Sequence, residues 1–153
     1  MTPRGRTNQL LYQAEVLLAT PVGDDEHAPA RRLALQEGAL ALFELALNSL
    51  LREVTEHARL PRHDWRLLLG VEGPALAELE RLRDLARQES WLGWLIAQLE
   101  RLHDIDGASE RRAPVREQFI AVSASTSLEQ TLLDQLAAAK RDIAALRETS
   151  FEW

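Results

Sequence analysis

The chain has 153 residues, of which 46% are hydrophobic and 27% are charged, and these values fit one globular domain with a real hydrophobic core. Its formal net charge of −6 argues against a nucleic-acid-binding surface, and its lack of cysteine excludes disulfides, thiolate metal sites and a cysteine nucleophile. No apolar run approaches the roughly 18 residues that a membrane span needs, so we expect a cytoplasmic protein without a membrane anchor.

The first predicted element is a helix over residues 8–19. Apolar residues recur through this range at the i, i+3, i+4, i+7 spacing of a helix with one buried face. Thr7 is expected to cap its N-terminus, and Pro21 is expected to end it, because the residue before a proline avoids helical geometry. Residues 1–6 are then expected to form a disordered lead.

The second predicted helix, from Pro29 to Leu60, is the element around which the chain is organised. Only Glu44 interrupts its apolar run over residues 39–47. A surface helix shows one apolar stripe, whereas a helix that is apolar nearly all round is enclosed by its neighbours. Pro29 suits a first helical turn, and Pro61 ends the helix. We therefore expect this to be the buried central helix of a bundle.

Capping signals divide the rest of the chain. Ser90 is a predicted N-cap, and two overlapping capping boxes begin at Thr126 and Ser127. The expected elements are a short capping segment at Trp65–Leu69, a helix opening at Pro74, a helix over Trp91–Asp104, a loop or extended connection over residues 105–126 and a last helix over Leu128–Thr149. The pattern leaves open whether the helices on either side of Ser90 form one kinked rod.

The fold prediction is an all-α, single-domain bundle over residues 1–153, with four long helices, one or two short helices and a buried central second helix. Two short motifs accompany this pattern, Arg6-Thr7-Asn8-Gln9-x-x-Tyr12 near the N-terminus and Glu89-Ser90-Trp91-Leu92 in mid-chain. With them the chain resembles a gammaproteobacterial family of small proteins of unknown function. The resemblance spans most of the chain. It implies a bacterial cytoplasmic protein and carries over no catalytic residue.

Polar residues on the central helix recur every four positions. Glu44, Asn48, Arg52 and Glu56 share one slowly drifting face. An unpaired buried polar group costs roughly 1–3 kcal/mol, so Glu44 and Asn48 need partners. One interpretation is structural, with Glu44 paired to Arg52 or to a first-helix group such as Asn8. The other is a polar groove that binds a ligand or peptide through Glu44, Asn48 and Arg52, and the sequence leaves both open.

An alternative, enzymatic function rests on Arg52 and His57. An arginine and a histidine five residues apart in a helical bundle are similar to the active-site motif of the HEPN family of ribonucleases. The resemblance implies that the two side chains act on an RNA phosphodiester without a metal. Against this, residues five apart on a continuous helix point about 140° away from each other, and Glu53 and Glu56 place negative charge beside the site.

The sequence gives little support for a metal site or a nucleotide site. Glu100-x-x-His103 has the spacing of a carboxylate-bridged di-metal bundle, but such a site needs the motif on two helices, and the chain has one copy. There is also no glycine-rich phosphate loop. We therefore predict neither a metal nor a cofactor.

The leading functional prediction is a non-enzymatic protein-interaction or adaptor module. The chain has four tryptophans, more than a core of this size requires, and tryptophan is enriched in binding hot spots. If Trp91 faces the core, Trp94 lies toward its edge and contributes to an apolar binding patch beside the loop at 106–114. The alternative is that all four tryptophans are core or rim residues. The expected partner is another protein or a second copy of the chain.

Overall fold

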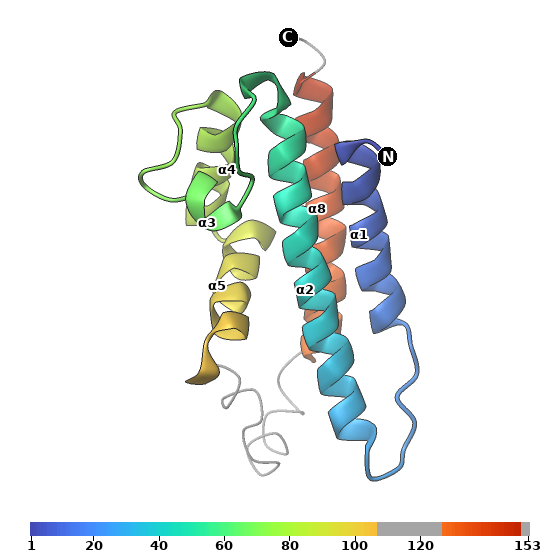
Figure 1. The fold of residues 1–153 in the computed structure, drawn as a ribbon. Coiled ribbons are helices and arrows are strands. Elements are labelled where there is room, and N and C mark those ends of the chain that lie inside the picture. Colours follow the sequence, from blue (N-terminus) through green and yellow to red (C-terminus); the bar gives the residue numbers. More distant parts are fainter. Residues whose placement is uncertain (107–126, 151–153) are drawn as a thin grey trace.

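A computed structural model describes residues 1–106 and 127–150, and the secondary structure in these two ranges is helical. The elements are α1 (Pro3–Leu18), α2 (Ala28–Val54), the 3-10 turn η1 (Glu56–Ala58), α3 (Trp65–Leu68), α4 (Ala77–Arg87), α5 (Trp91–His103) and α8 (Leu128–Ser150). Helices α1, α2 and α8 pack together, and α3, α4 and α5 lie on the other side of α2 (Figure 1). The predicted all-α bundle is confirmed, and the five longer described helices are α1, α2, α4, α5 and α8. The predicted connection over 105–126 lies, from residue 107 on, outside the described residues.

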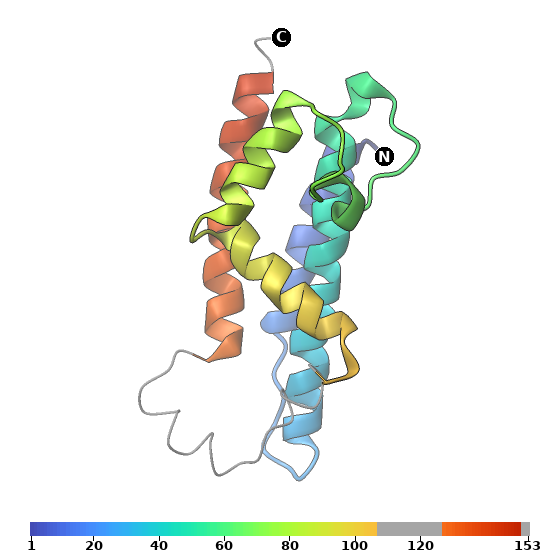
Figure 2. The ribbon, with the colours of Figure 1, turned by 90° about the vertical axis from the view of Figure 1, so that its left-hand side faces the viewer.

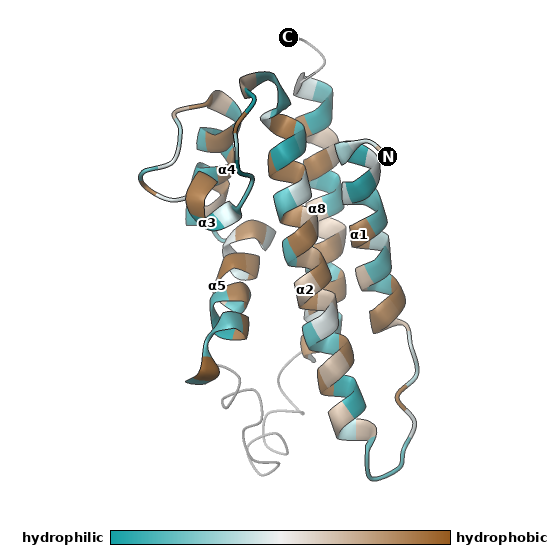
Figure 3. Cartoon of the chain, in the orientation of Figure 1, coloured by the Kyte–Doolittle hydropathy of each residue, from teal (hydrophilic) through white to brown (hydrophobic). Residues whose placement is uncertain are grey.

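The central helix α2 supplies the largest set of buried side chains in the described core. Apolar residues recur along it and its neighbours (Figure 3), and α2 contacts α1, α3, α5 and α8. Phe43, only 1% exposed, stacks on Trp91 of α5 with the ring centroids 6.0 Å apart. The expected enclosure is nevertheless incomplete, because Leu45 is 48% exposed and Ala41 is exposed too. One stripe of α2 therefore faces outward between α1 and the connection to α3.

Helix α1 begins five residues earlier than predicted. The Thr2 hydroxyl accepts a hydrogen bond from the Gly5 N–H at 3.0 Å, and Pro3 occupies the first turn, where its missing N–H costs nothing. Thr7, the predicted cap, is instead fully buried inside the helix, and its hydroxyl lies 2.9 Å from the Pro3 carbonyl oxygen. The expected disordered lead over residues 1–6 is therefore wrong from Pro3 onward.

Helix α2 ends at Val54, six residues before the predicted end. The Thr55 hydroxyl donates to the Leu51 carbonyl oxygen at 2.6 Å, and the chain then tightens into η1. Arg59 follows with a φ of 49°, a left-handed conformation that commonly terminates helices. The chain has therefore already reversed before Pro61, and it leads back along α2 to α3.

Helices α4 and α5 are two separate rods that meet at a bend (Figure 2), which settles the question that the sequence left open. At the bend the Ser90 hydroxyl accepts from the Gly93 N–H at 3.1 Å and donates to the Leu85 carbonyl oxygen at 2.6 Å. The predicted cap at Ser90 is thus confirmed, and the bend carries Trp91 onto α2.

Helix α8 bonds to both α1 and α2 through one arginine. Arg147 donates to the two carboxylate oxygens of Glu53 at 2.6 and 3.0 Å, and to the Asn8 side-chain oxygen at 2.9 Å. The side chains of Arg147 and Glu53 are only 13% and 15% exposed. At the start of α8 the Ser127 hydroxyl accepts from the Gln130 N–H at 3.2 Å, so half of that predicted capping box is present. The box that begins at Thr126 lies outside the described residues.

Candidate functional site

Glu44, the polar residue in the middle of the apolar run, binds two other helices. Its carboxylate accepts from the Trp65 indole N–H of α3 at 2.8 Å and lies 2.8 Å from Nε2 of His103 at the end of α5. The predicted pairing of Glu44 with Arg52 or Asn8 is wrong. The turn after η1 brings Trp65 back to α2, where its indole bonds to Glu44, and Asn8 accepts a hydrogen bond from Arg147 instead. Glu44 therefore has a structural role that joins α2, α3 and α5.

Asn48, one turn further along α2, has one structural contact and one open side. Its side-chain oxygen accepts from the backbone N–H of Trp65 at 3.0 Å, while Asp64 accepts from the N–H of Arg66 at 3.0 Å. These two bonds satisfy donors of the first turn of α3. The Asn48 amide nitrogen has no hydrogen bond to a described residue, and the side chain lines a cavity.

This cavity, which we call the α2 cavity, lies between the start of α1, the outward stripe of α2 and the connection before α3. Its volume is about 420 Å³. Its apolar wall consists of Met1, Pro3, Leu10 and Leu45. Its polar lining consists of Thr2, Arg6, Asn48, Ser49, Arg52 and His63. The cavity thus combines apolar and cationic surface, and it contains Asn48 and Arg52, two of the residues that the sequence suggested for binding.

The charges at the α2 cavity are positive. Arg52 is exposed and makes no hydrogen bond or ion pair with any residue that the structure describes. Arg6 donates to the Gln9 side-chain oxygen at 2.6 Å, and no acidic residue belongs to the described lining. Burial, and secondarily the charge of Arg52, lower the pKa of His63 below its ordinary value. On a chain with a net charge of −6, this is a locally cationic site with one uncommitted guanidinium.

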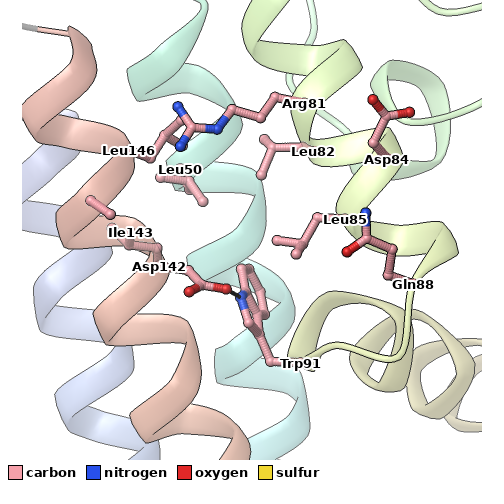
Figure 4. Close-up of a pocket in the computed structure, with 11 residues that line it drawn as sticks. Leu50, Arg81, Leu82, Asp84, Leu85, Gln88, Trp91, Asp142, Ile143 and Leu146 are labelled. Carbon is pink, nitrogen blue, oxygen red and sulfur yellow. Dashed lines mark hydrogen bonds between the residues drawn. The ribbon is translucent and has the colours of Figure 1, made fainter.

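A second cavity of about 300 Å³ lies between α2, α4, α5 and α8 (Figure 4). Apolar side chains including Leu50 and Leu82 line it, and its charged groups already have partners within the protein. Arg81 donates to Thr149, Asp84 accepts from Arg87, and Asp142 accepts from the Trp91 indole at 2.8 Å. Each of these charged side chains has a hydrogen-bond partner within the described chain, so this cavity is the weaker candidate.

The structure does not bring Arg52 and His57 together. Because α2 ends at Val54, His57 lies in η1, where its Nε2 is 3.8 Å from a carboxylate oxygen of Glu78 on α4. Arg52 instead lines the α2 cavity beside His63. Sequence reasoning overlooked His63 because it lies eleven residues away in a turn, and only the path of the chain after η1 places it beside Arg52.

Trp94 lies at the edge of the core, as the spacing from Trp91 indicated. Trp91 is 3% exposed, whereas Trp94 is half-buried and packs against the core cluster. The neighbouring loop that was expected to border an apolar patch lies outside the described residues from residue 107 on. A binding role for Trp94 stays a prediction.

The lone Glu-x-x-His motif is not part of a larger cluster in the described chain. His103 contacts Glu44 on α2. Within residues 1–106 and 127–150, the structure gathers no group of three or more histidine, aspartate or glutamate side chains that could hold a metal ion. None of the described helices is both long enough and apolar enough to cross a membrane.

Comparisons with known proteins agree with the resemblance seen in the sequence. A model of a family of unknown function, DUF6586, matches residues 1–153. A search of curated proteins found no match, and a search of solved structures found none either. The match extends over the full sequence given. The chain therefore belongs to this family of unknown function.

Proposed function

We propose that the chain is a non-enzymatic interaction protein of the bacterial cytoplasm, and that it docks a segment of a protein partner in the α2 cavity. The observation that carries this proposal is the position of Arg52. Its guanidinium has no partner among the described residues, and it lines the same cavity as the exposed side chain of Leu45. An apolar surface next to an uncommitted cation suits a segment with both an apolar and a polar side chain.

The size of the cavity and the origin of its walls suit docking. Ligand pockets commonly measure about 300–1,000 Å³, so a volume of about 420 Å³ can accept one or two side chains of a partner. Its walls come from α1 and α2, which pack along their lengths, and from the turn before α3, which Asn48 holds at Trp65. Arginine is also enriched among the residues that dominate binding energy at protein interfaces.

The geometry does not favour the ribonuclease alternative. That function requires Arg52 and His57 to act on one phosphodiester, and the two side chains have different surroundings. Glu78 beside His57 adds a carboxylate where a phosphate would have to lie. The α2 cavity therefore supports binding better than it supports cleavage of RNA.

Site-specific photo-crosslinking in the native cell tests the proposal. A photoreactive amino acid in place of Leu45 is expected to form an adduct with a separate protein, because this side chain is an exposed part of the cavity wall. The same amino acid in place of Ala137, which is exposed on α8 away from the cavity, is the control.

Adducts from Ala137 equal to those from Leu45, or no adduct from Leu45, would contradict the proposal. An adduct between two copies of the chain would show that a second copy, and not a separate partner, occupies the cavity. Mass spectrometry of the adduct distinguishes these results.

A further inference from the structure

The charged end of the α2 cavity is built from three separate segments of the chain. Arg6 comes from α1, Arg52 from α2 and His63 from the turn before α3. Met1 also lines the cavity. Asp64 follows His63 in sequence, but its carboxylate accepts from the Arg66 N–H. The groups around His63 are therefore predominantly positive.

The positive charges around His63 disfavour protonation of its imidazole. Burial is the larger cause of the lowered pKa of His63, and the nearby Arg52 is the second. In the free protein the lowered pKa of His63 favours the neutral imidazole at neutral pH. An anion bound between Arg52 and His63 would offset the repulsion from Arg52, and it would stabilise the imidazolium form.

We infer that the α2 cavity recognises a carboxylate of the docked segment next to an apolar side chain, and that binding is coupled to the uptake of one proton by His63. This inference rests on the proposed docking function and adds the chemistry of the partner. Charge complementarity selects the carboxylate, because the described lining contains two arginines and no acidic residue. The net charge of −6 disfavours a long acidic tract, so the expected segment pairs isolated carboxylates with apolar residues.

The coupling has a defined sign. The proton comes from solvent and adds to the free ring nitrogen of His63 as the carboxylate binds. Affinity therefore increases as pH falls through the interval between the pKa of His63 in the complex and its lower pKa in the free protein. Uptake of a single proton limits the change to at most about tenfold per pH unit.

Calorimetric titration with a defined peptide tests the inference. The probe is a blocked hexapeptide of alternating glutamate and leucine, and the same peptide with glutamine for glutamate is its neutral control. Between about pH 8 and about pH 5.5 the glutamates stay largely ionised, so they contribute little to the pH dependence. The glutamate peptide is expected to bind several-fold more tightly at the lower pH, and the glutamine peptide is expected to bind weakly at both.

The variant His63→Gln separates His63 from the other histidines. It keeps a polar side chain but cannot be protonated, so its affinity for the glutamate peptide, whatever its value at about pH 8, should not increase at about pH 5.5. In the wild-type protein, NMR titration should show the pKa of His63 rising when the peptide saturates the cavity. This second measurement does not depend on how well the variant folds.

Each contrary result rules out a different part of the inference. Affinity for the glutamate peptide that does not change with pH, or an unchanged His63 titration, would overturn the proton coupling. Equal binding of the two peptides, or binding of neither, would overturn carboxylate recognition. The docking function itself is judged separately by the adduct from Leu45, so its failure and the failure of this inference are distinguishable.

Discussion

Phe43 is the side chain that connects the central helix most directly to α5. It is 1% exposed and its ring stacks on Trp91 at an interplanar angle of 9°. Replacing Phe43 with alanine removes this contact and leaves a cavity, so we expect a loss of about 3–5 kcal/mol in the free energy of unfolding. Leu45→Ala, two residues away on the exposed stripe, should change it by no more than about 0.5 kcal/mol. Chemical denaturation measures both free energies of unfolding, and an equally small loss for the two variants would contradict the core position of Phe43.

At the residue scale, sequence periodicity located part of the candidate site. The four-residue spacing from Glu44 to Arg52 placed Asn48 and Arg52 near each other on α2, and both line the cavity. The partners could not be found in this way. Arg6 and His63 reach the cavity from segments far from Arg52 in the sequence, and their positions depend on the start of α1 and on the reversal after α2.

At the element scale, the positions of the helices could be predicted better than their ends. Leucine spacing indicated the buried faces, because burial of an apolar stripe is what stabilises most helices in proteins. The helix ends depend on short-range capping interactions, and neighbouring residues compete to supply them. Helix α1 begins before Thr7 because Thr2 caps it and Pro3 fits its first turn. Helix α2 ends with Thr55 as its C-cap, and Arg59 is left-handed, so the helix has ended before the proline at position 61 is reached.

Attachment of α8 to the α1–α2 pair should depend on Glu53 and Arg147. Each single variant, Glu53→Gln or Arg147→Met, leaves its former partner's charge largely buried, and so both should be destabilising. The double variant should lose less than the sum of the two, with a coupling free energy of about 0.5–3 kcal/mol. Denaturation of all four proteins gives this value. Strict additivity would mean that the ion pair does not hold α8 in place.

At the scale of the whole molecule, Trp94 tests whether binding extends beyond the α2 cavity. It is half-buried, whereas Trp91 is 3% exposed and bonded to Asp142. Trp94→Ala should therefore cost less stability than Trp91→Ala, for which we expect about 3–5 kcal/mol. If Trp94 contributes to a binding patch, its variant should also lower partner capture while remaining folded. Equal stability losses for the two variants, with partner capture by Trp94→Ala unchanged, would show that Trp94 is simply a core residue.

The central claim is that the α2 cavity binds its partner through Arg52, and charge reversal tests it most directly. The measurement is the yield of the photo-crosslinked adduct from position 45 in two backgrounds, Arg52→Glu and Arg141→Glu. Both arginines are exposed, and both variants change the net charge equally, but Arg141 lies on α8 away from the cavity. We predict that Arg52→Glu abolishes most of the adduct and that Arg141→Glu leaves it at the wild-type level. An undiminished adduct with Arg52→Glu, or an equal loss with Arg141→Glu, would contradict the claim.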